Sequence, residues 1–145
     1  MKRVFTKIFE DYVSASGVPP VKNDAALSWL LQEDIEVIAA VINIQCVAPS
    51  ENDGFSNCVV ELSQVGLFAQ NGTILTGRAG EGWNTTPAGI LQTNCNIAMV
   101  FEAGMAVPVR EEGYLHINTE AGGKSAGISI FYYTVTVYYT KKGSR

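Results

Sequence analysis

Ile128-Ser-Ile-Phe-Tyr-Tyr-Thr-Val-Thr-Val-Tyr-Tyr-Thr140 is the stretch that decides the fold. Its residues are almost all β-branched or aromatic, the types that fit a pleated, packed surface, and no Gly or Pro interrupts them. The run predicts a single strand about 40 Å long at ~3.3 Å per residue. An unpaired strand of this length would be a template for aggregation. We therefore expect it in the middle of a sheet, or with its edge covered by a neighbouring chain.

Alternate residues of this predicted strand divide into two faces. One face is apolar enough to lie in a core and consists of Phe131, Tyr133, Val135, Val137 and Tyr139. The other is semi-polar and aromatic and consists of Ile130, Tyr132, Thr134, Thr136 and Tyr138. We expect the second face to meet another subunit, with Tyr132 and Tyr138 as contact residues.

Length and composition favour one domain with much of its surface in contacts. The chain has 145 residues, of which 17% are charged, and a formal net charge of -4. A soluble domain usually carries about 25% charged residues. Basic residues are scattered, which argues against nucleic-acid binding, and no apolar run reaches the ~18 residues of a membrane span. Lys7, Glu10 and Asp11 interrupt the apolar segment that a signal peptide would need, so we expect synthesis and retention in the cytoplasm of the producing cell.

Residues 1–24 are predicted to form an arm, and residues 25–145 a β-sandwich domain. Apolar residues recur in the arm at steps of three and four, which permits a short amphipathic helix, and Pro19-Pro20 then breaks regular structure. The arm is either extended or helical, and it either docks on its own sandwich or reaches a neighbour. Its predicted subunit or capsid contacts are Val4, Phe5, Ile8, Phe9 and Tyr12.

The remaining chain is predicted to contain about eight strands. Leu27 to Leu31 is read as a strand, although Asn23 or Asp24 could cap a helix there. The run 35–47 is apolar on both sides, as expected of a strand covered on both faces, and 57–70 is predicted to return beside it in a hairpin across Asp53-Gly54. Further strands are expected at 73–77, 94–101 and 114–119, and a loop at 78–86. Regular turn signals without βαβ alternation predict an all-β, antiparallel, jelly-roll-like sandwich.

The sequence offers little chemistry, and we predict no catalytic residue, cofactor or metal site. His116 is the one histidine and lies mid-strand. Cys46, Cys58 and Cys95 lack metal-ligand spacing and are read as buried reduced thiols, although the first two could face each other across a hairpin. The acid pairs Glu10-Asp11, Glu33-Asp34 and Glu111-Glu112 are read as solvated turns and rims rather than a glycosidase pair. Glu51 to Asp53 resembles the start of a calcium loop, but no acid follows at the required distance.

Trp83 and Asn84 form the most site-like surface stretch, with Thr85 and Thr86 after them. An aromatic platform beside amides and hydroxyls is how a shallow sugar site is built, so both are predicted as glycan contacts. The structural alternative is a Trp that plugs a loop against its own sheet or a neighbour.

In overall style the sequence resembles small tailed-phage virion proteins of the jelly-roll type, including head-decoration, cement and head-fibre proteins. The resemblance lies in the apolar stretch Val4 to Val13, in Glu33-Asp-Ile-Glu-Val-Ile-Ala-Ala with Glu51-Asn-Asp-Gly, in Pro108-Val-Arg-Glu-Glu-Gly-Tyr-Leu-His-Ile, and in the Tyr-rich strand. It implies a non-enzymatic structural protein of the virion, which forms homo-oligomers, often trimers, binds a major capsid protein and stabilises the head. A carbohydrate-binding or fibre-associated adhesion module is the alternative.

Overall fold

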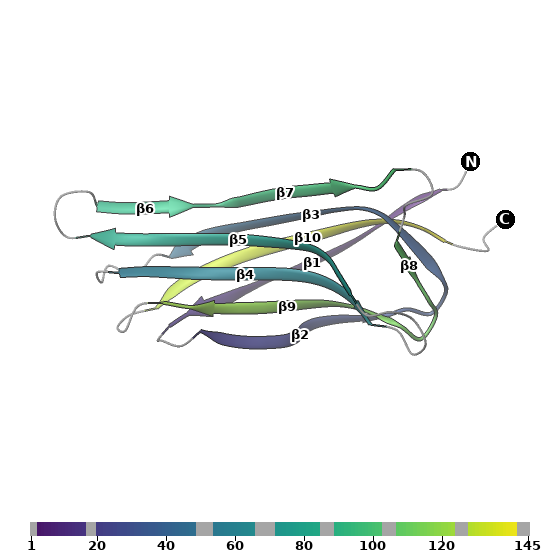
Figure 1. Cartoon of the computed structure of the whole chain (residues 1–145), viewed down its shortest axis with the longest axis horizontal. Coiled ribbons are helices and arrows are strands. Elements are labelled where there is room, and N and C mark those ends of the chain that lie inside the picture. The colour runs from purple at the N-terminus through teal and green to yellow at the C-terminus, as the bar shows by residue number, and fades with distance from the viewer. Residues whose placement is uncertain are drawn as a thin grey trace.

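The computed structural model describes residues 3–16, 20–48, 54–65, 72–84, 89–102, 107–123 and 128–141. These residues form ten strands: β1 (Val4–Ala15), β2 (Val21–Leu30), β3 (Ile35–Ala48), β4 (Gly54–Val65), β5 (Gly72–Asn84), β6 (Gly89–Thr93), β7 (Cys95–Val100), β8 (Val107–Val109), β9 (Tyr114–Gly122) and β10 (Ser129–Lys141). The long strands run along the long axis of an elongated molecule, and the short strand β8 crosses it at one end (Figure 1). The described part of the chain holds no helix that could cross a membrane.

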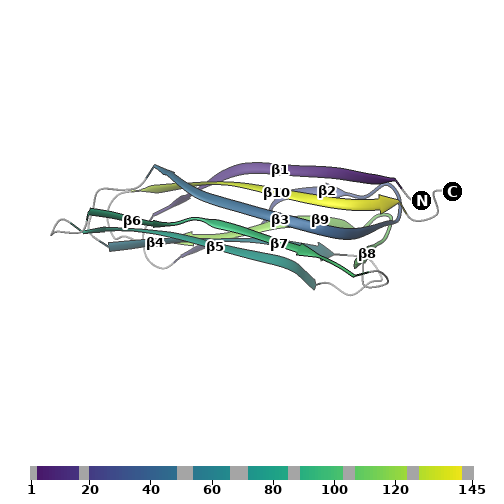
Figure 2. The same cartoon turned by 90° about the horizontal axis from the view of Figure 1, so that it is seen from above.

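The strands form two antiparallel sheets packed face to face (Figure 2). Sheet A has the order β1-β10-β3-β7, with β8 also pairing β3, and sheet B has the order β2-β9-β4-β5-β6. Strands pair in a nested way, because β1 pairs β10, β2 pairs β9, β3 pairs β8 and β4 pairs β5. From β1 to β4 the chain changes sheet at every connection. This nesting is that of a long hairpin rolled into a sandwich, so the predicted jelly-roll-like fold is confirmed.

The predicted long strand is β10, and it lies between β1 and β3 in the middle of sheet A. Its two faces are as predicted. Phe131, Val135 and Val137 are fully buried between the sheets, whereas Tyr132 on the opposite face is 38% exposed. Residues from both sheets complete this core, among them Ile42 of β3 and Leu62 of β4. Burial of the odd-numbered side chains of β10 therefore fixes its register against both neighbours.

The amino-terminal segment is a strand and not a helix. β1 pairs with β10 along its whole length, from Val4 opposite Thr140 to Ala15 opposite Ser129. The extended alternative was right, and the segment docks on its own sandwich. Residue 24, the predicted boundary of the arm, lies inside β2.

The predicted hairpin of 35–47 with 57–70 is wrong, because β3 belongs to sheet A and β4 to sheet B. The two strands therefore lie in different layers of the sandwich and do not pair with each other. β3 is also covered on one face only: Ile42 and Ile44 are buried, whereas Asn43 and Gln45 are exposed. The expectation of two covered faces for this strand is corrected accordingly.

The predicted loop at 78–86 is also wrong for residues 78–84, which continue β5. They pair with β4 on one side and with β6 on the other. The strands expected near 27–31, 94–101 and 114–119 are confirmed as β2, β7 and β9. Residues 85–86 of the predicted loop and the Glu51 to Asp53 stretch lie outside the described residues.

Candidate functional site

The outer face of sheet A is broad and carries very little charge. We define it by the cross-strand rows that pass through Tyr132, Thr134, Thr136 and Tyr138 of β10. From β1 across to β7 these rows read Tyr12-Tyr132-Gln45, Glu10-Thr134-Asn43-Asn96, Ile8-Thr136-Val41-Ala98 and Thr6-Tyr138-Ala39-Val100. Glu10 is the one charged residue within these rows, and the next acid, Glu36, lies in the row beyond them. A face of this composition can be covered by another surface at a small desolvation cost.

Large apolar side chains stand out from this face rather than folding into it. Ile8 is 54% exposed, Tyr12 is 62% exposed and Val100 is 78% exposed. The single carboxylate among them is hydrogen bonded within the face, because the hydroxyl of Tyr132 donates to Oε2 of Glu10. That hydrogen bond raises the pKa of Tyr132, together with partial desolvation and the nearby charges of Glu10 and Asp11.

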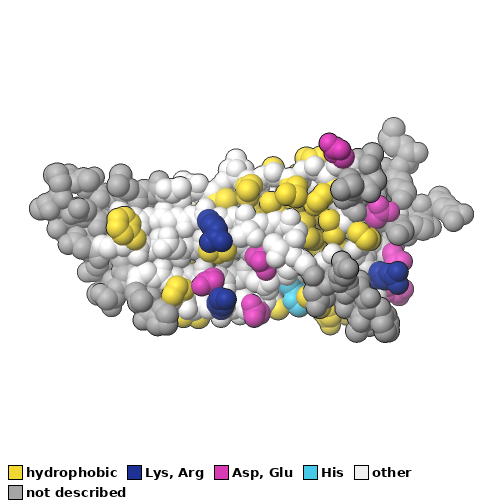
Figure 3. Space-filling view, viewed as in Figure 1, with side chains coloured by type: hydrophobic (Ala, Val, Ile, Leu, Met, Phe, Trp, Pro, Cys, Tyr) yellow, Lys and Arg dark blue, Asp and Glu magenta, His cyan; other side chains and the backbone are white. Residues whose placement is uncertain are grey.

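Sheet B presents the opposite chemistry on its outer face. Charged side chains of both signs gather over the middle of this face (Figure 3), and they include Lys22, Asp24, Glu61, Arg78 and Glu120. Glu61 is held by its neighbours, since Asn118 Nδ2 donates to Oε1 at 2.9 Å and the Thr73 hydroxyl donates to Oε2 at 2.9 Å. The two outer faces of the sandwich therefore differ sharply, one nearly uncharged and one solvated.

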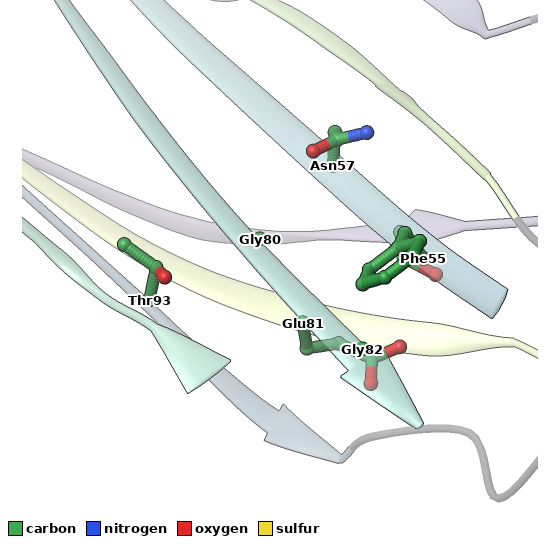
Figure 4. Close-up of a pocket in the computed structure, with 7 residues that line it drawn as sticks. Phe55, Asn57, Gly80, Glu81, Gly82 and Thr93 are labelled. Carbon is green, nitrogen blue, oxygen red and sulfur yellow. The ribbon is translucent and has the colours of Figure 1, made fainter. Parts of the chain in front are cut away.

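A hollow interrupts the outer face of sheet B near the amino end of β4. Phe55 and Asn57 of β4 lie opposite Gly82 and Gly80 of β5, and Asn57 also lies opposite Gly122 of β9. Since Gly80 has no side chain, the space beside Asn57 stays open, and a hollow of about 520 Å³ results. The ring of Phe55 lies over Gly82, and Pro20 lies over Gly122. Figure 4 shows the side chains of Phe55, Asn57 and Thr93 around the bare backbone at Gly80. A second hollow of about 240 Å³ adjoins it at Asn57.

A buried polar cluster joins the two sheets below this hollow. Glu81 of β5 is only 3% exposed, and the hydroxyl of Ser129 of β10 donates to its Oε1 at 2.5 Å. The hydroxyl of Ser56 of β4 in turn donates to that of Ser129 at 3.2 Å. His116 of β9 is placed elsewhere, on the outer face of sheet B with its ring 5.2 Å from that of Tyr114. The cluster thus links the two sheets by hydrogen bonds, and His116 is not placed to act as a base for it.

The structure separates the predicted contact residues into two groups. Val4, Ile8 and Tyr12 point outward from β1 and are exposed. Phe9 is 5% exposed and belongs to the core, so its predicted contact role is corrected. Phe5 is half-buried and stacks on Tyr139, with ring centroids 5.6 Å apart. Because the strand alternates with a period of two, Phe5 and Phe9 face inward, where Phe5 stacks on β10 and Phe9 joins the core.

The remaining predicted residues are placed as follows. Tyr138 is half-buried on the outer face of sheet A. Trp83 and Asn84 end β5, and their side chains lie outside the described residues. The three cysteines are free thiols, and burial, with a smaller contribution from Cys95, raises the pKa of Cys58 to about 12. Cys46 and Cys58 lie in opposite sheets and not across a hairpin. Within the described part of the chain, no three His, Cys, Asp or Glu side chains gather into a metal-binding group.

Sequence reasoning missed the hollow at Phe55 and Asn57. Its signal was present as glycines at alternate positions, Gly80 and Gly82, which place two bare positions on one face of a strand. Both glycines lie in the stretch 78–86, for which the sequence predicts a loop, and glycine inside a strand generally weakens it. Once the residues are known to be a strand, the same glycines predict a depression on its outer side.

Comparisons with known proteins return structural neighbours only. No family model and no curated protein matches the chain. Among solved structures it is similar to a chain of infectious bursal disease virus, Gx strain, with a TM-score of 0.42, 11% identity and coverage of 100% of this chain and 33% of that one. It is similar to a CocE/NonD family hydrolase from Staphylococcus aureus with a TM-score of 0.44, 7% identity and coverage of 93% and 37%. It is also similar to Eiger TNF from S. frugiperda, with a TM-score of 0.32, 13% identity and coverage of 75% of this chain and 62% of that one.

The chain spans about a third of the length of the viral chain, 33%. Further structures of infectious bursal disease virus are also similar to it, including the VP2 subviral particle at 12% identity and a TM-score of 0.40. Viral capsid proteins are thus among its structural neighbours, together with a hydrolase and a TNF.

Proposed function

We propose that this protein is a structural component of a virus particle that assembles through the outer face of sheet A. In its specific form, the proposal is a decoration or cement protein that forms homo-oligomers on a tailed-phage head, binds the major capsid protein and resides in the virion. The observation that carries the proposal is the near absence of charge on that face, where Glu10 alone is charged in the four rows. On this proposal the protein acts by binding and not by catalysis.

The size of the face suits a stable contact. The four rows cover six residue steps of β10, about 20 Å at ~3.3 Å per residue, and four strands spaced ~4.8 Å apart make this plane roughly 400 Å². Strands β1, β10 and β3 extend the face beyond the rows. A specific interface buries about 800 Å² per partner, and side-chain relief makes the accessible area larger than the plane. The apolar side chains that protrude, Ile8, Tyr12 and Val100 among them, are the kind that supply the core of such a contact.

Packing by the face is favoured over pairing by the edge. β1 is an edge strand of sheet A, and its outer edge could in principle accept another strand. Its inward side carries Lys7 and Asp11, and inward-pointing charges on an edge strand oppose edge-to-edge pairing. The Lys7 ammonium makes a cation–π contact within the molecule, 5.3 Å from the ring centroid of Trp29. A partner is therefore expected on the broad face and not along β1.

A single charge placed in the face tests the proposal. Deleting residues 1–20 would remove β1 and unpair β10, so a substitution is the sharper experiment. Ile8→Lys adds a cation at a 54% exposed position without disturbing the core. We expect Ile8→Lys to dissociate the oligomer in native mass spectrometry and to lower the occupancy of purified phage heads in electron micrographs.

Ser28→Lys is the matched control, because Ser28 is exposed on β2 of sheet B. It adds the same charge to the solvated side of the sandwich and should leave oligomer and occupancy unchanged. The proposal fails if the unmodified chain is a monomer that does not bind heads. It also fails if Ile8→Lys assembles as well as Ser28→Lys.

A further inference from the structure

We propose that the hollow at Phe55 and Asn57 binds a neutral oligosaccharide. The inference concerns the outer face of sheet B and is independent of assembly through sheet A. The hollow is built into the strands: Gly80 and Gly122 flank Asn57 in one cross-strand row, and Gly82 lies opposite Phe55. Gly80 leaves bare backbone between Asn57 and Thr93 in this row, while the ring of Phe55 lies over Gly82 and Pro20 lies over Gly122. The backbone at Gly80 gives a floor on which a flat ligand can lie against the sheet.

Phe55 is the apolar part of the site. Its ring is 72% exposed although it sits on a strand, and exposure of a large aromatic surface to water is costly. The ring lies over Gly82, where an added Cβ would be 2.6 Å from two ring carbons. The position of the ring is therefore set from below by the glycine backbone. A sugar ring offers one face of C–H groups that packs on such an aromatic plane.

Polar groups around this ring match the hydroxyls of a sugar. The amide of Asn57 can donate and accept at once, and so can the hydroxyl of Thr93, as vicinal hydroxyl groups require. Both side chains line the same hollow as Phe55. An aromatic plane with a few convergent polar groups is the usual composition of a small-ligand site.

The adjoining hollow extends the site and sets the charge of its ligand. It is lined by Asn57, Val59, Arg78, Glu120 and Gly122, with Pro20 at its border. From Gly82 to Arg78 the two hollows run about 13 Å along β5 at ~3.3 Å per residue, which accommodates more than one sugar ring. Arg78 and Glu120 lie on either side of Val59, so one cation and one anion share the second hollow. Balanced charge favours a neutral ligand over an anionic one.

The test uses the full chain on an array that carries neutral oligosaccharides and sialylated ones, followed by calorimetry with the best neutral ligand. Phe55→Ala and Asn57→Ala should each weaken binding about 3- to 10-fold, the range expected for the loss of one hydrogen bond or its equivalent. Tyr114→Ala is the matched control, since it removes an aromatic ring that is 37% exposed at the end of β9 far from Gly122, outside both the hollow and the outer face of sheet A. It should leave the affinity unchanged, and all variants should keep the thermal midpoint of the parent.

A third variant fills the floor without removing a recognition group. A Cβ at Gly80 would lie 3.2 Å from Oδ1 of Asn57 and from the backbone oxygen of Ser56, a tight but tolerable fit. We expect Gly80→Ala to weaken binding by closing the space beside Asn57. The inference is overturned if no neutral oligosaccharide binds at millimolar concentration, if only the sialylated ones bind, or if Tyr114→Ala weakens binding as much as Phe55→Ala does.

Discussion

Gly77 lies where the two sheets pack closely against each other, and Gly77→Ala tests that packing. It lies on β5 of sheet B and is buried. A Cβ built there would be 2.8 Å from Cγ2 of Ile42 in β3 of sheet A and 2.9 Å from Sγ of Cys95 in β7. Ile42 is fully buried, so it has no free space into which to move. A single methyl group would therefore force the sheets apart or push Ile42 off its rotamer.

The expected cost follows from that overlap. Extra methyl groups in a well-packed core typically destabilise by about 1–3 kcal/mol. For a domain of this size, ~1 kcal/mol changes the melting temperature by roughly 2–4 °C, so Gly77→Ala should lower it by about 2–12 °C. Urea unfolding followed by tryptophan fluorescence, under reducing conditions, measures the free energy directly. The slope against denaturant should stay constant if only the native packing has changed.

Gly72→Ala is the control, because an added Cβ there meets no atom within 4 Å. Restricting the unfolded chain at such a position stabilises by about 0.4–1 kcal/mol or has no effect. Removing Sγ in a Cys95→Ala background should relieve part of the strain, so the double variant should be more stable than the sum of the single effects predicts. The packing argument is refuted if Gly77→Ala is as stable as Gly72→Ala.

Three further outcomes are expected. Burial raises the pKa of Cys58 and of Tyr133 to about 12. Their contribution to the free energy of unfolding is therefore complete below pH ~9 and is lost as the pH rises toward ~12. Urea midpoints measured from pH 8 to 11.5 should fall, and the fall should be smaller in Cys58→Ala. Ser129→Ala removes the hydrogen bond to Glu81 and should cost about 1–3 kcal/mol, measured against Glu81→Gln in a double-variant cycle. Phe131→Ala, at a fully buried position, should cost about 3–5 kcal/mol, and a loss below 1 kcal/mol in urea would contradict the assigned core.

The sequence predicts the structure best where the alternation of residues within one strand shows which of its faces is buried. In β10, alternation of apolar with semi-polar residues fixes both faces, and burial of Phe131 and exposure of Tyr132 follow from that pattern alone. In the amino-terminal segment, the same residue spacing is compatible with both a helix and a strand. Pairs such as Phe5 and Phe9 repeat every four residues, which suits one helical face but is also a multiple of the strand period of two. Pairing with β10 decided between them, and pairing partners are not visible in β1 itself.

The hairpin error has a different cause. A turn cluster such as Pro49 to Gly54 shows that the chain reverses direction, but it does not show to which sheet it returns. In a jelly roll β3 and β4 run antiparallel in opposite sheets, so local reversal and sheet pairing are separate facts. The hollow was missed for a related reason, since the meaning of Gly80 depends on Asn57 across the ladder and not on its neighbours in sequence.

The distribution of charge between the two outer faces is the feature that joins the two proposals. Alternation along each strand requires only that one side be apolar enough for the core, and it leaves the composition of the outer side free. Sheet B carries charged residues on its outer side, as a solvated monomer would, and Lys22, Glu61 and Arg78 are among them. Sheet A does not, since its outer rows hold Glu10 alone and even that carboxylate accepts a hydrogen bond from Tyr132. Solubility needs charge on both sides of a free sandwich, so the asymmetry is explained if sheet A is covered by a partner while sheet B, with its hollow, stays open to ligand.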